Sequence, residues 1–347
     1  MKKEVILFQN LETSKFKSDR MRKTIKAALK ASFIGYSFEK LDTEAKIAHF
    51  IPPFRFSTVE KTQAFDKKIV VSAFYTEGEK SSSVSNYRNI KNLSKTNITQ
   101  NYLKSFQKAD KILVPNNQFV EVLRKKGIET SKIEVLNPGI NVKIYKYLPE
   151  TDMELTRRYY SLSEDIKILL IFGNAKDKEC MSETIKLANL RKDCKIIFLA
   201  TNPRPVEGFK ARFKRIFSKK IPSNLILTTF KDINVYRSLL KNCRALIYFN
   251  TTLIDEIQLN EAFAAEIQVI GYDRCFSKAI LDKNIVIHSD NHKDLFEKLC
   301  DYIDYKISGT ISNASFYIEE NDVKYTGEKL KEIYKNLLLE EENNDRY

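Results

Sequence analysis

Glycine is scarce in this sequence, at nine of 347 residues. Neither GxGxxG nor GxxxxGKS/T, the glycine-rich patterns that hold a dinucleotide or a triphosphate, occurs anywhere in the chain. The nucleophile turn GxSxG is also absent. Dinucleotide-dependent enzymes, P-loop nucleotide hydrolases and serine-elbow hydrolases therefore have no support from a motif.

Cysteine and histidine are scarce as well. The five cysteines form no CxxC pair and their number is odd, which favours reduced structural thiols in a cytoplasmic protein over a disulfide framework or a zinc site. Two of the three histidines, His288 and His292, are four residues apart in HSDNH. The neighbouring sequence offers no complete ligand set, so we expect a strand end and a helix cap there, and no metal site.

Long apolar runs are missing too. No run reaches the roughly 18 residues that a membrane-spanning helix needs. The apolar stretch VILF near the start is too short for the core of a signal peptide, and we interpret it as a first strand. We therefore expect a cytoplasmic protein, and its 347 residues favour two domains.

What is abundant is positive charge, with a formal net charge of +14. Residues 14–30 hold seven basic residues and one acidic residue, and residues 209–220 hold six basic residues and no acidic one. Such clusters attract phosphates of nucleotides, anionic lipids or nucleic acids. Phenylalanines alternate with the charges in 209–220, as in surfaces that stack on nucleic-acid bases. Their spacing of four is, however, that of one buried helical face, so nucleic acid is the less favoured partner.

Short apolar strands alternate with amphipathic helices along the whole chain. This order is typical of parallel sheets covered by helices on both faces, and its two runs predict two doubly wound, Rossmann-like domains. We expect the first domain in 1–155, the second in 156–325, and a last helix in 326–347 that crosses back to the first domain. The predicted strands are 3–8, 45–51, 68–75, 109–115 and 132–139, then 166–173, 194–201, 224–230, 245–249, 267–271 and 284–288. The first predicted helix has Met21, Ile25, Leu29 and Phe33 on its apolar face. The other predicted helices span 118–127 (ended by Gly127), 181–190, 206–219, 232–242, 291–305 and 326–341.

One carboxylate stands out against this pattern. Glu261 lies between the strands 245–249 and 267–271, in a segment otherwise rich in Ala, Leu and Phe. Ligands of doubly wound folds bind at the carboxyl edge of the strands, and in two-domain proteins a cleft between domains is the natural site. Glu261 therefore faces either water or such a ligand-binding crevice.

Three blocks of sequence resemble family 4 glycosyltransferases, which have the GT-B architecture of two Rossmann-like domains facing across a cleft. Residues 109–147, ADKILVPNNQFVEVLRKKGIETSKIEVLNPGINVKIYKY, are similar to the family's strand "aDxvivpS" and its turn "kixvixnGvdxxxF". IFGNAKDKE (171–179) resembles "fvGrlxxxKg", and LNEAFAAEIQVIG (259–271) resembles "lEAmacGxPVia". The resemblance to the family is good over about residues 110–290 and weak over residues 1–108.

The resemblance implies a transferase that moves a sugar from a UDP- or GDP-sugar to a glycan, lipid-linked or protein acceptor. It implies retention of configuration, with the donor phosphate acting as the base, and neither metal nor cofactor. It assigns Lys178 to the charge of the leaving diphosphate and Glu261 to the ribose hydroxyls. It also puts His49 in register with a strand-end histidine, so Lys178 and His49 are the expected catalytic residues. The residues expected to bind the donor are Gly173, Asn174, Asn250, Glu256 and Glu261. Tyr75 and Glu77, after a predicted strand, are candidate acceptor contacts.

Several positions depart from the family pattern. Asn174 replaces an arginine, Leu253 an acid and Phe74 a histidine. Glu256 stands where glycine is usual beside the phosphates, and its carboxylate would repel a diphosphate. A glycosyltransferase-like binding subunit with an impaired site is therefore the alternative, and simpler roles stay open for two residues: a packed core histidine for His49 and a solvated helix residue for Glu261.

The basic segments also suggest a membrane. Basic amphipathic helices are attracted to anionic lipid, and many proteins of the resembled family use lipid-linked acceptors. We therefore expect peripheral association with the inner face of a membrane through 14–30 and 209–220, with a solvated basic face as the alternative.

Overall fold

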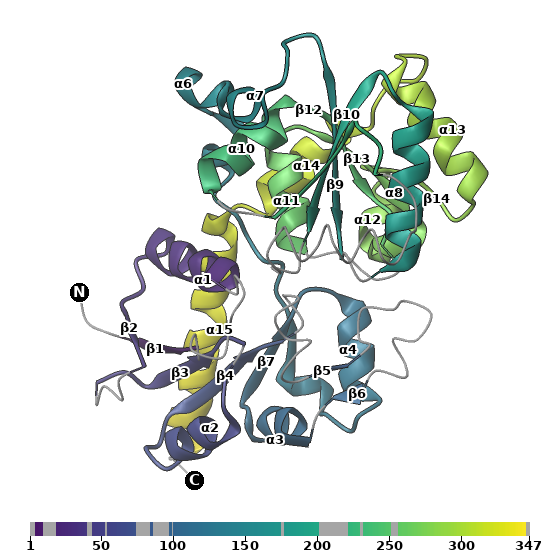
Figure 1. Cartoon of the computed structure of the whole chain (residues 1–347). Coiled ribbons are helices and arrows are strands. Elements are labelled where there is room, and N and C mark those ends of the chain that lie inside the picture. The colour runs from purple at the N-terminus through teal and green to yellow at the C-terminus, as the bar shows by residue number, and fades with distance from the viewer. Residues whose placement is uncertain are drawn as a thin grey trace. The chain divides into compact units, whose positions relative to one another are not determined.

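The chain forms two compact units in a computed structural model (Figure 1). The structure describes residues 4–9, 19–39, 44–52, 54–73, 84–85, 97–98, 100–174, 177–200, 221–229, 232–250 and 256–344. Unit 1 comprises Met1–Asn141, Asp255–Asn260 and Glu320–Tyr347, and unit 2 comprises Val142–Ile254 and Glu261–Glu319. Residues 142–155 thus lie with unit 2, whereas the sequence pattern assigned them to the first domain.

Unit 1 is built on a six-stranded sheet in the order β2-β1-β3-β4-β7-β8, and all of its strand pairs are parallel. Every residue of β1 and β3 is buried, which explains why both strands are apolar apart from His49 of β3. The strands are β1 (Val5–Phe8), β2 (Tyr36–Phe38), β3 (Ile47–Phe50), β4 (Lys68–Ser72), β7 (Lys111–Val114) and β8 (Ile133–Val135). A separate antiparallel pair joins β5 (Val84–Ser85) to β6 (Asn97–Ile98).

The helices of unit 1 form where apolar residues recur at helical spacing. They are α1 (Asp19–Ala31), α2 (Phe56–Gln63), α3 (Gln100–Lys108), α4 (Asn117–Arg124) and α15 (Val323–Asn344). Helix α4 ends shortly before Gly127, which has a φ of 79°, so the expected stop is confirmed. The expected apolar face of α1 is correct except for Phe33. Phe33 lies beyond the helix end with a φ of 58° and is 81% exposed, because the chain leaves the helix before reaching it.

The late helix α15 packs on α1 within unit 1. At Gly327 the two helices approach so closely that a Cβ atom would collide with the Ala28 carbonyl and the Ser32 hydroxyl. Glycine is therefore required at this helix crossing, and a segment made after unit 2 completes the core of unit 1.

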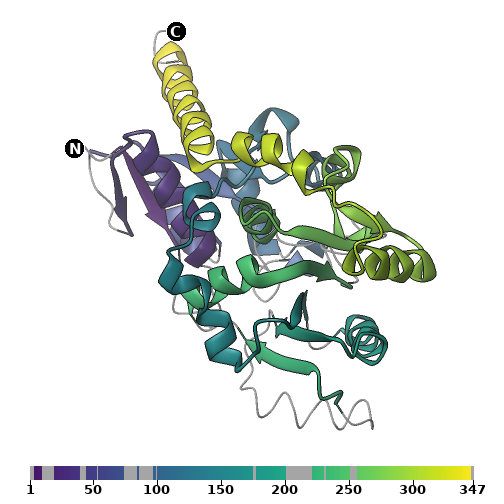
Figure 2. The same ribbon diagram turned by 90° about the horizontal axis from the view of Figure 1, so that it is seen from above.

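Unit 2 contains the second six-stranded sheet, in the order β11-β10-β9-β12-β13-β14, again with parallel pairs throughout. Helices lie on both sides of its strands, as the two views in Figures 1 and 2 show. Its strands are β9 (Lys167–Gly173), β10 (Cys194–Ala200), β11 (Leu225–Thr229), β12 (Cys243–Tyr248), β13 (Gln268–Tyr272) and β14 (Ile287–Ser289). Its helices are α5 (Val142–Lys146), α6 (Glu150–Met153), α7 (Leu155–Tyr160), α8 (Lys178–Leu190), α10 (Ile233–Asn242), α12 (Lys278–Asp282), α13 (His292–Ile303) and α14 (Ala314–Glu320).

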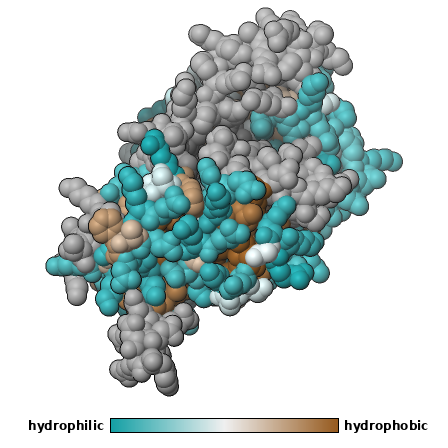
Figure 3. Space-filling view, turned by 90° about the horizontal axis from the view of Figure 1, so that it is seen from below, coloured by the Kyte–Doolittle hydropathy of each residue, from teal (hydrophilic) through white to brown (hydrophobic). Residues whose placement is uncertain are grey.

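Helix α11 (Glu256–Ala264) is divided between the units, with Glu256–Asn260 in unit 1 and the residues from Glu261 onward in unit 2. The surface in Figure 3 is mainly hydrophilic where it is described, with hydrophobic residues in separate patches. Among the described helices, none combines the length and the apolar character that crossing a bilayer demands.

Candidate functional site

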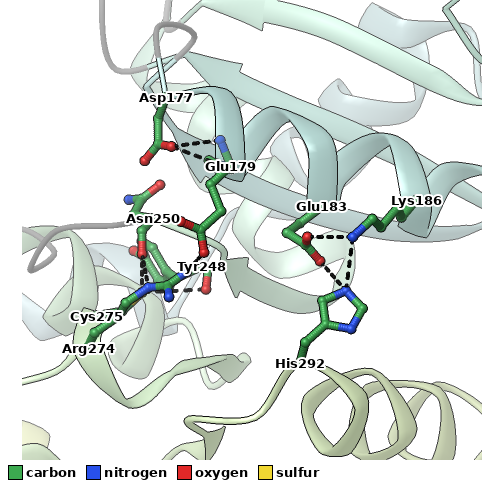
Figure 4. A network of polar contacts seen from close by, with 10 residues as sticks. Asp177, Glu179, Glu183, Lys186, Tyr248, Asn250, Arg274, Cys275 and His292 are labelled. Carbon is green, nitrogen blue, oxygen red and sulfur yellow. Dashed lines mark hydrogen bonds and ion pairs between the residues drawn. The ribbon is translucent and has the colours of Figure 1, made fainter.

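The carboxyl edge of the unit 2 sheet collects polar side chains. Strands β9, β12 and β13 are parallel neighbours, so the residues that follow them meet at one edge. Asn174 directly follows β9, Asn250 comes two residues after β12, and Arg274 comes two residues after β13. Figure 4 shows Asn250 and Arg274 beside the first turn of α8.

Helix α8 begins at this edge and exposes its amino end. The Asp177 carboxylate caps the helix by accepting hydrogen bonds from the backbone N–H groups of Glu179 and Cys180, both at 3.1 Å. Lys178, the first residue of the helix, is exposed. Its ammonium group and the partial positive charge of the helix start both favour a bound anion.

Gly173 is required by packing at the same edge. A Cβ atom here would lie 2.6 Å from the Cys180 sulfur and 2.7 Å from the Phe198 ring. The missing side chain therefore lets the first turn of α8 approach the end of β9. Glycine at this position thus has a packing reason, while the role of Gly173 toward a donor stays a prediction.

Arg274 is a second cation at this edge, which our sequence analysis missed because it sought an arginine directly after Gly173. Its Nε donates to the carbonyl oxygen of Asn250 at 3.2 Å, and its guanidinium lies 4.3 Å above the Tyr272 ring and forms an ion pair with Glu179. The side chain is 26% exposed. Within the described residues, the buried amide oxygen of Asn250 has no hydrogen-bond partner.

Glu261 is buried in unit 2. Its side chain lies on α11 and the residue is only 3% exposed. Each carboxylate oxygen accepts a hydrogen bond from a tyrosine hydroxyl: Oε1 from Tyr145 at 2.6 Å and Oε2 from Tyr236 at 2.7 Å. The alternative of a solvated helix glutamate is therefore wrong, because the residue is buried and two tyrosine hydroxyls donate to its carboxylate.

Glu256, at the start of α11, contacts Asn116 of unit 1. Its Oε1 accepts a hydrogen bond from the Asn116 amide at 3.2 Å, and the Asn116 oxygen in turn caps α4 by accepting from the Gln118 N–H at 3.1 Å. Glu256 thus stabilises a helix cap of unit 1, and donor binding by this residue stays a prediction.

His49 lies in the core of unit 1. It is fully buried on β3, its Nδ1 is 2.7 Å from the Tyr334 hydroxyl and its Nε2 is 2.8 Å from the Ser72 hydroxyl. Burial lowers the pKa of the imidazole to about 3. The ring is therefore neutral at physiological pH and joins β3, β4 and α15, as the packed-histidine alternative describes. The catalytic role stays a prediction.

Some predicted features lie outside the described residues: Tyr75, Glu77, the helix 206–219 and the basic segment 209–220.

The two neighbouring histidines pair with separate carboxylates. His288 Nδ1 lies 2.8 Å from Asp273 Oδ1, and His292 Nε2 lies 2.5 Å from the buried carboxylate of Glu183. Lys186 Nζ lies 2.9 Å from an oxygen of the same carboxylate. Figure 4 shows both this lysine and His292 beside Glu183. In the described part of the chain, no three histidine, cysteine or acidic side chains gather as a metal site would require.

All five cysteines are free thiols, as predicted. Burial raises the pKa of the Cys275 thiol to about 12 and that of the Cys194 thiol to about 11, so both stay protonated at neutral pH.

Comparison with known proteins gives a fold and no sequence family. No protein-family model and no curated protein matches the sequence. Among solved structures, HepE from Anabaena in complex with UDP is 11% identical, with 96% of this chain and 100% of HepE covered at a TM-score of 0.68. A glycosyltransferase from Rickettsia africae is 15% identical, with coverage of 97% and 99% and a TM-score of 0.66. WaaG, a glycosyltransferase involved in lipopolysaccharide biosynthesis, is 16% identical, with coverage of 95% and 99% and a TM-score of 0.61.

At these identities the likeness shows the fold alone. The chain has the GT-B fold with two Rossmann-like domains, each with a parallel six-stranded sheet, and the fold class expected from the sequence is confirmed. Membership of family 4 stays a prediction.

Proposed function

We propose that the protein is a glycosyltransferase that moves a sugar from a nucleotide-sugar to an acceptor. The observation that carries this proposal is the carboxyl edge of the unit 2 sheet, where α8 begins with the exposed Lys178 and where Arg274, paired with Glu179, lies beside its first turn. A nucleotide-sugar brings a diphosphate that suits such an edge. HepE, with the same fold, was crystallised with UDP and with UDP-glucose, which supports a UDP- or GDP-sugar as the donor.

In this proposal Lys178 and the helix start stabilise the diphosphate as it leaves, when its negative charge grows. Arg274 is proposed to supply the charge of the arginine that Asn174 replaces. Glu261 accepts hydrogen bonds from the ribose, while Gly173, Asn174 and Asn250 complete the donor site. Transfer proceeds with retention, the donor phosphate takes the acceptor proton, and no protein nucleophile, metal or cofactor takes part.

The acceptor is a glycan, a lipid-linked sugar or a protein, and Tyr75 and Glu77 are the proposed contacts. A second candidate function is a binding subunit with an impaired site. The substitutions Asn174 and Leu253, at positions where the resembled family has charged residues, favour it.

A panel of UDP-, GDP-, ADP- and dTDP-sugars separates the two functions. We expect one UDP- or GDP-sugar to stabilise the folded protein by about 2.7 kcal/mol at a concentration of 100 times its Kd, because a ligand that binds only the folded state adds its binding free energy. Thermal unfolding measures the shift, and release of the free nucleotide measures turnover. Absence of any nucleotide-dependent shift would favour the impaired subunit.

We further propose that the protein acts peripherally on the inner face of an anionic membrane. Lys23 and Lys30 are exposed on α1, and the exposed ring of Phe33 follows the helix. Such a surface combines charge for lipid headgroups with an apolar side chain for the interface. WaaG shares the fold and takes part in lipopolysaccharide biosynthesis, which supports a lipid-linked acceptor.

Binding to anionic vesicles should weaken as salt rises, because the Debye length falls from about 10 Å at 0.1 M to about 3 Å at 1 M. Each basic residue near the surface contributes about 1 kcal/mol. We therefore expect the double variant Lys23→Gln/Lys30→Gln to bind such vesicles more weakly in a sedimentation assay.

The matched control is Lys61→Gln/Lys125→Gln, which removes the same charge from two other exposed positions of unit 1. Equal binding to neutral vesicles, or an equal loss in both double variants, would contradict a membrane contact through α1.

A further inference from the structure

Arg274 is held by three contacts at the carboxyl edge of the unit 2 sheet. Its Nε donates to the carbonyl oxygen of Asn250 at 3.2 Å, and its guanidinium lies 4.3 Å above the Tyr272 ring. The third contact is the ion pair with Glu179, whose side chain extends from the first turn of α8 toward the arginine in Figure 4. The first two contacts fix the position of Arg274, and the third also determines how much charge it presents.

Glu179 offsets the positive charge of Arg274. A carboxylate in contact with a guanidinium cancels most of the electrostatic field that the cation directs at a third group. The two residues before Glu179 do not change this balance, since Asp177 adds one negative charge and Lys178 adds one positive charge. These four side chains therefore carry no excess of positive charge while the ion pair is closed.

A diphosphate would compete with Glu179 for Arg274. Carboxylates and phosphates both bind a guanidinium through paired, charge-assisted hydrogen bonds, so they suit the same donors. Of the five N–H donors of Arg274, the one on Nε serves Asn250 and one on Nη2 serves Glu179. A phosphate that binds through both terminal nitrogens therefore approaches the nitrogen that already serves the carboxylate.

Glu179 is the partner that can leave the ion pair. Its side chain is 48% exposed, whereas that of Arg274 is 26% exposed and keeps its contacts with Asn250 and Tyr272 when the pair opens. An ion pair this close to solvent contributes little to the stability of the fold, and the released carboxylate regains water. Rotation of one side chain thus exposes the charge of an arginine whose position is already fixed.

We infer that Glu179 is a competing carboxylate that restrains Arg274 in the unliganded protein and releases it when the diphosphate of a nucleotide binds. This inference rests on the proposed function, because it requires a nucleoside diphosphate at the unit 2 site. Opening the ion pair uses part of the binding free energy of the nucleotide. Glu179 therefore lowers the affinity for the nucleotide, and it does so through Arg274.

The test is calorimetric titration of UDP and GDP into the wild type, Glu179→Gln, Arg274→Gln and the double variant. Glu179→Gln removes the charge at nearly constant shape and should raise the affinity for the bound nucleotide several-fold, because Arg274 no longer has to be released. Arg274→Gln should lower the affinity. In the double variant the gain from Glu179→Gln should disappear, since the two residues act as a coupled pair.

Glu154→Gln is the matched control, because it makes the same chemical change in another glutamate–arginine pair of unit 2. Glu154 lies 2.7 Å from Arg158, and its side chain is 60% exposed. This variant should keep the wild-type affinity. Thermal unfolding shows whether each variant is folded, and Arg274→Met, which keeps an apolar stem over Tyr272, serves if Arg274→Gln is not.

The outcomes are distinct. The inference is overturned if Glu179→Gln binds the nucleotide no more tightly than the wild type, or if Arg274→Gln binds it equally well. A gain of the same size with and without Arg274 also overturns it, because that gain would reflect only repulsion between the carboxylate and the nucleotide. In each of these cases nucleotide binding by the wild type stands. If the wild type binds neither UDP nor GDP, the proposed function itself fails, and the inference fails with it.

Discussion

Lys178→Ala is expected to lower the turnover of sugar transfer by about 10²- to 10³-fold while the affinity for the nucleotide-sugar falls much less. Removing one preorganised group that faces developing charge typically costs this much, because the leaving diphosphate gains charge in the transition state. Lys178 is exposed at the first position of α8, where the helix start adds to its charge. The measurement is kcat and KM for the donor that the panel identifies.

The conservative variant Lys178→Arg keeps the charge and should recover part of the lost turnover. Lys293→Ala is the matched control, because that side chain is 86% exposed on α13 of the same unit. A loss of donor affinity as large as the loss of turnover would mean that Lys178 stabilises the bound donor as strongly in the ground state as in the transition state. Wild-type turnover in Lys178→Ala would remove the lysine from the proposed mechanism.

Acid should destabilise unit 1 through His49. Burial lowers the pKa of this residue to about 3 in the folded state, whereas it is about 6.5 in an unfolded chain. Between these two values the unfolded chain binds a proton that the folded chain does not, so stability falls as pH falls from about 6.5 toward 3. The slope from this one residue is about 1.4 kcal/mol per pH unit, and the total loss over this window is about 5 kcal/mol.

Calorimetry between pH 7 and pH 5 tests this, because most carboxylates do not titrate in that window. His49→Gln should be less stable than the wild type at pH 7, since the Tyr334 and Ser72 hydroxyls lose their shared partner. Its stability should nevertheless depend less on pH. His292→Gln, at a half-exposed histidine of unit 2, is the control. An unchanged slope in His49→Gln would mean that other groups cause the acid effect.

The fold could be predicted from the sequence to a large extent, for a physical reason. Parallel strands buried on both faces need unbroken apolar segments, and such segments as β1, β9 and β12 are visible without any knowledge of their neighbours. Strand β2 was missed because its three residues are all half-buried and form no apolar run. Phe33 was misplaced because its spacing fits a helix that has already ended.

The candidate site could be predicted only in its local parts. Gly173 and Lys178 share one strand–turn–helix segment, so their proximity is encoded in a short stretch of sequence. Tyr145 lies 116 residues from Glu261, and Tyr334 lies 285 residues from His49. Contacts over such separations depend on how whole elements pack, and no local spacing reports them. The position of Arg274 is another such long-range feature, since the end of β13 brings this residue to Glu179 of α8.

The packing of α15 on α1 has a consequence for biosynthesis. A ribosome makes the strands of unit 1 first and then all of unit 2, and only afterwards makes the helix that carries Gly327 and Tyr334. Until that helix emerges, α1 lacks its packing partner and His49 of β3 lacks one hydrogen bond. Domains usually mature in the order of translation. In this chain unit 1 is completed only after unit 2 has been synthesised. The core of unit 1 therefore stays incomplete while unit 2 is made.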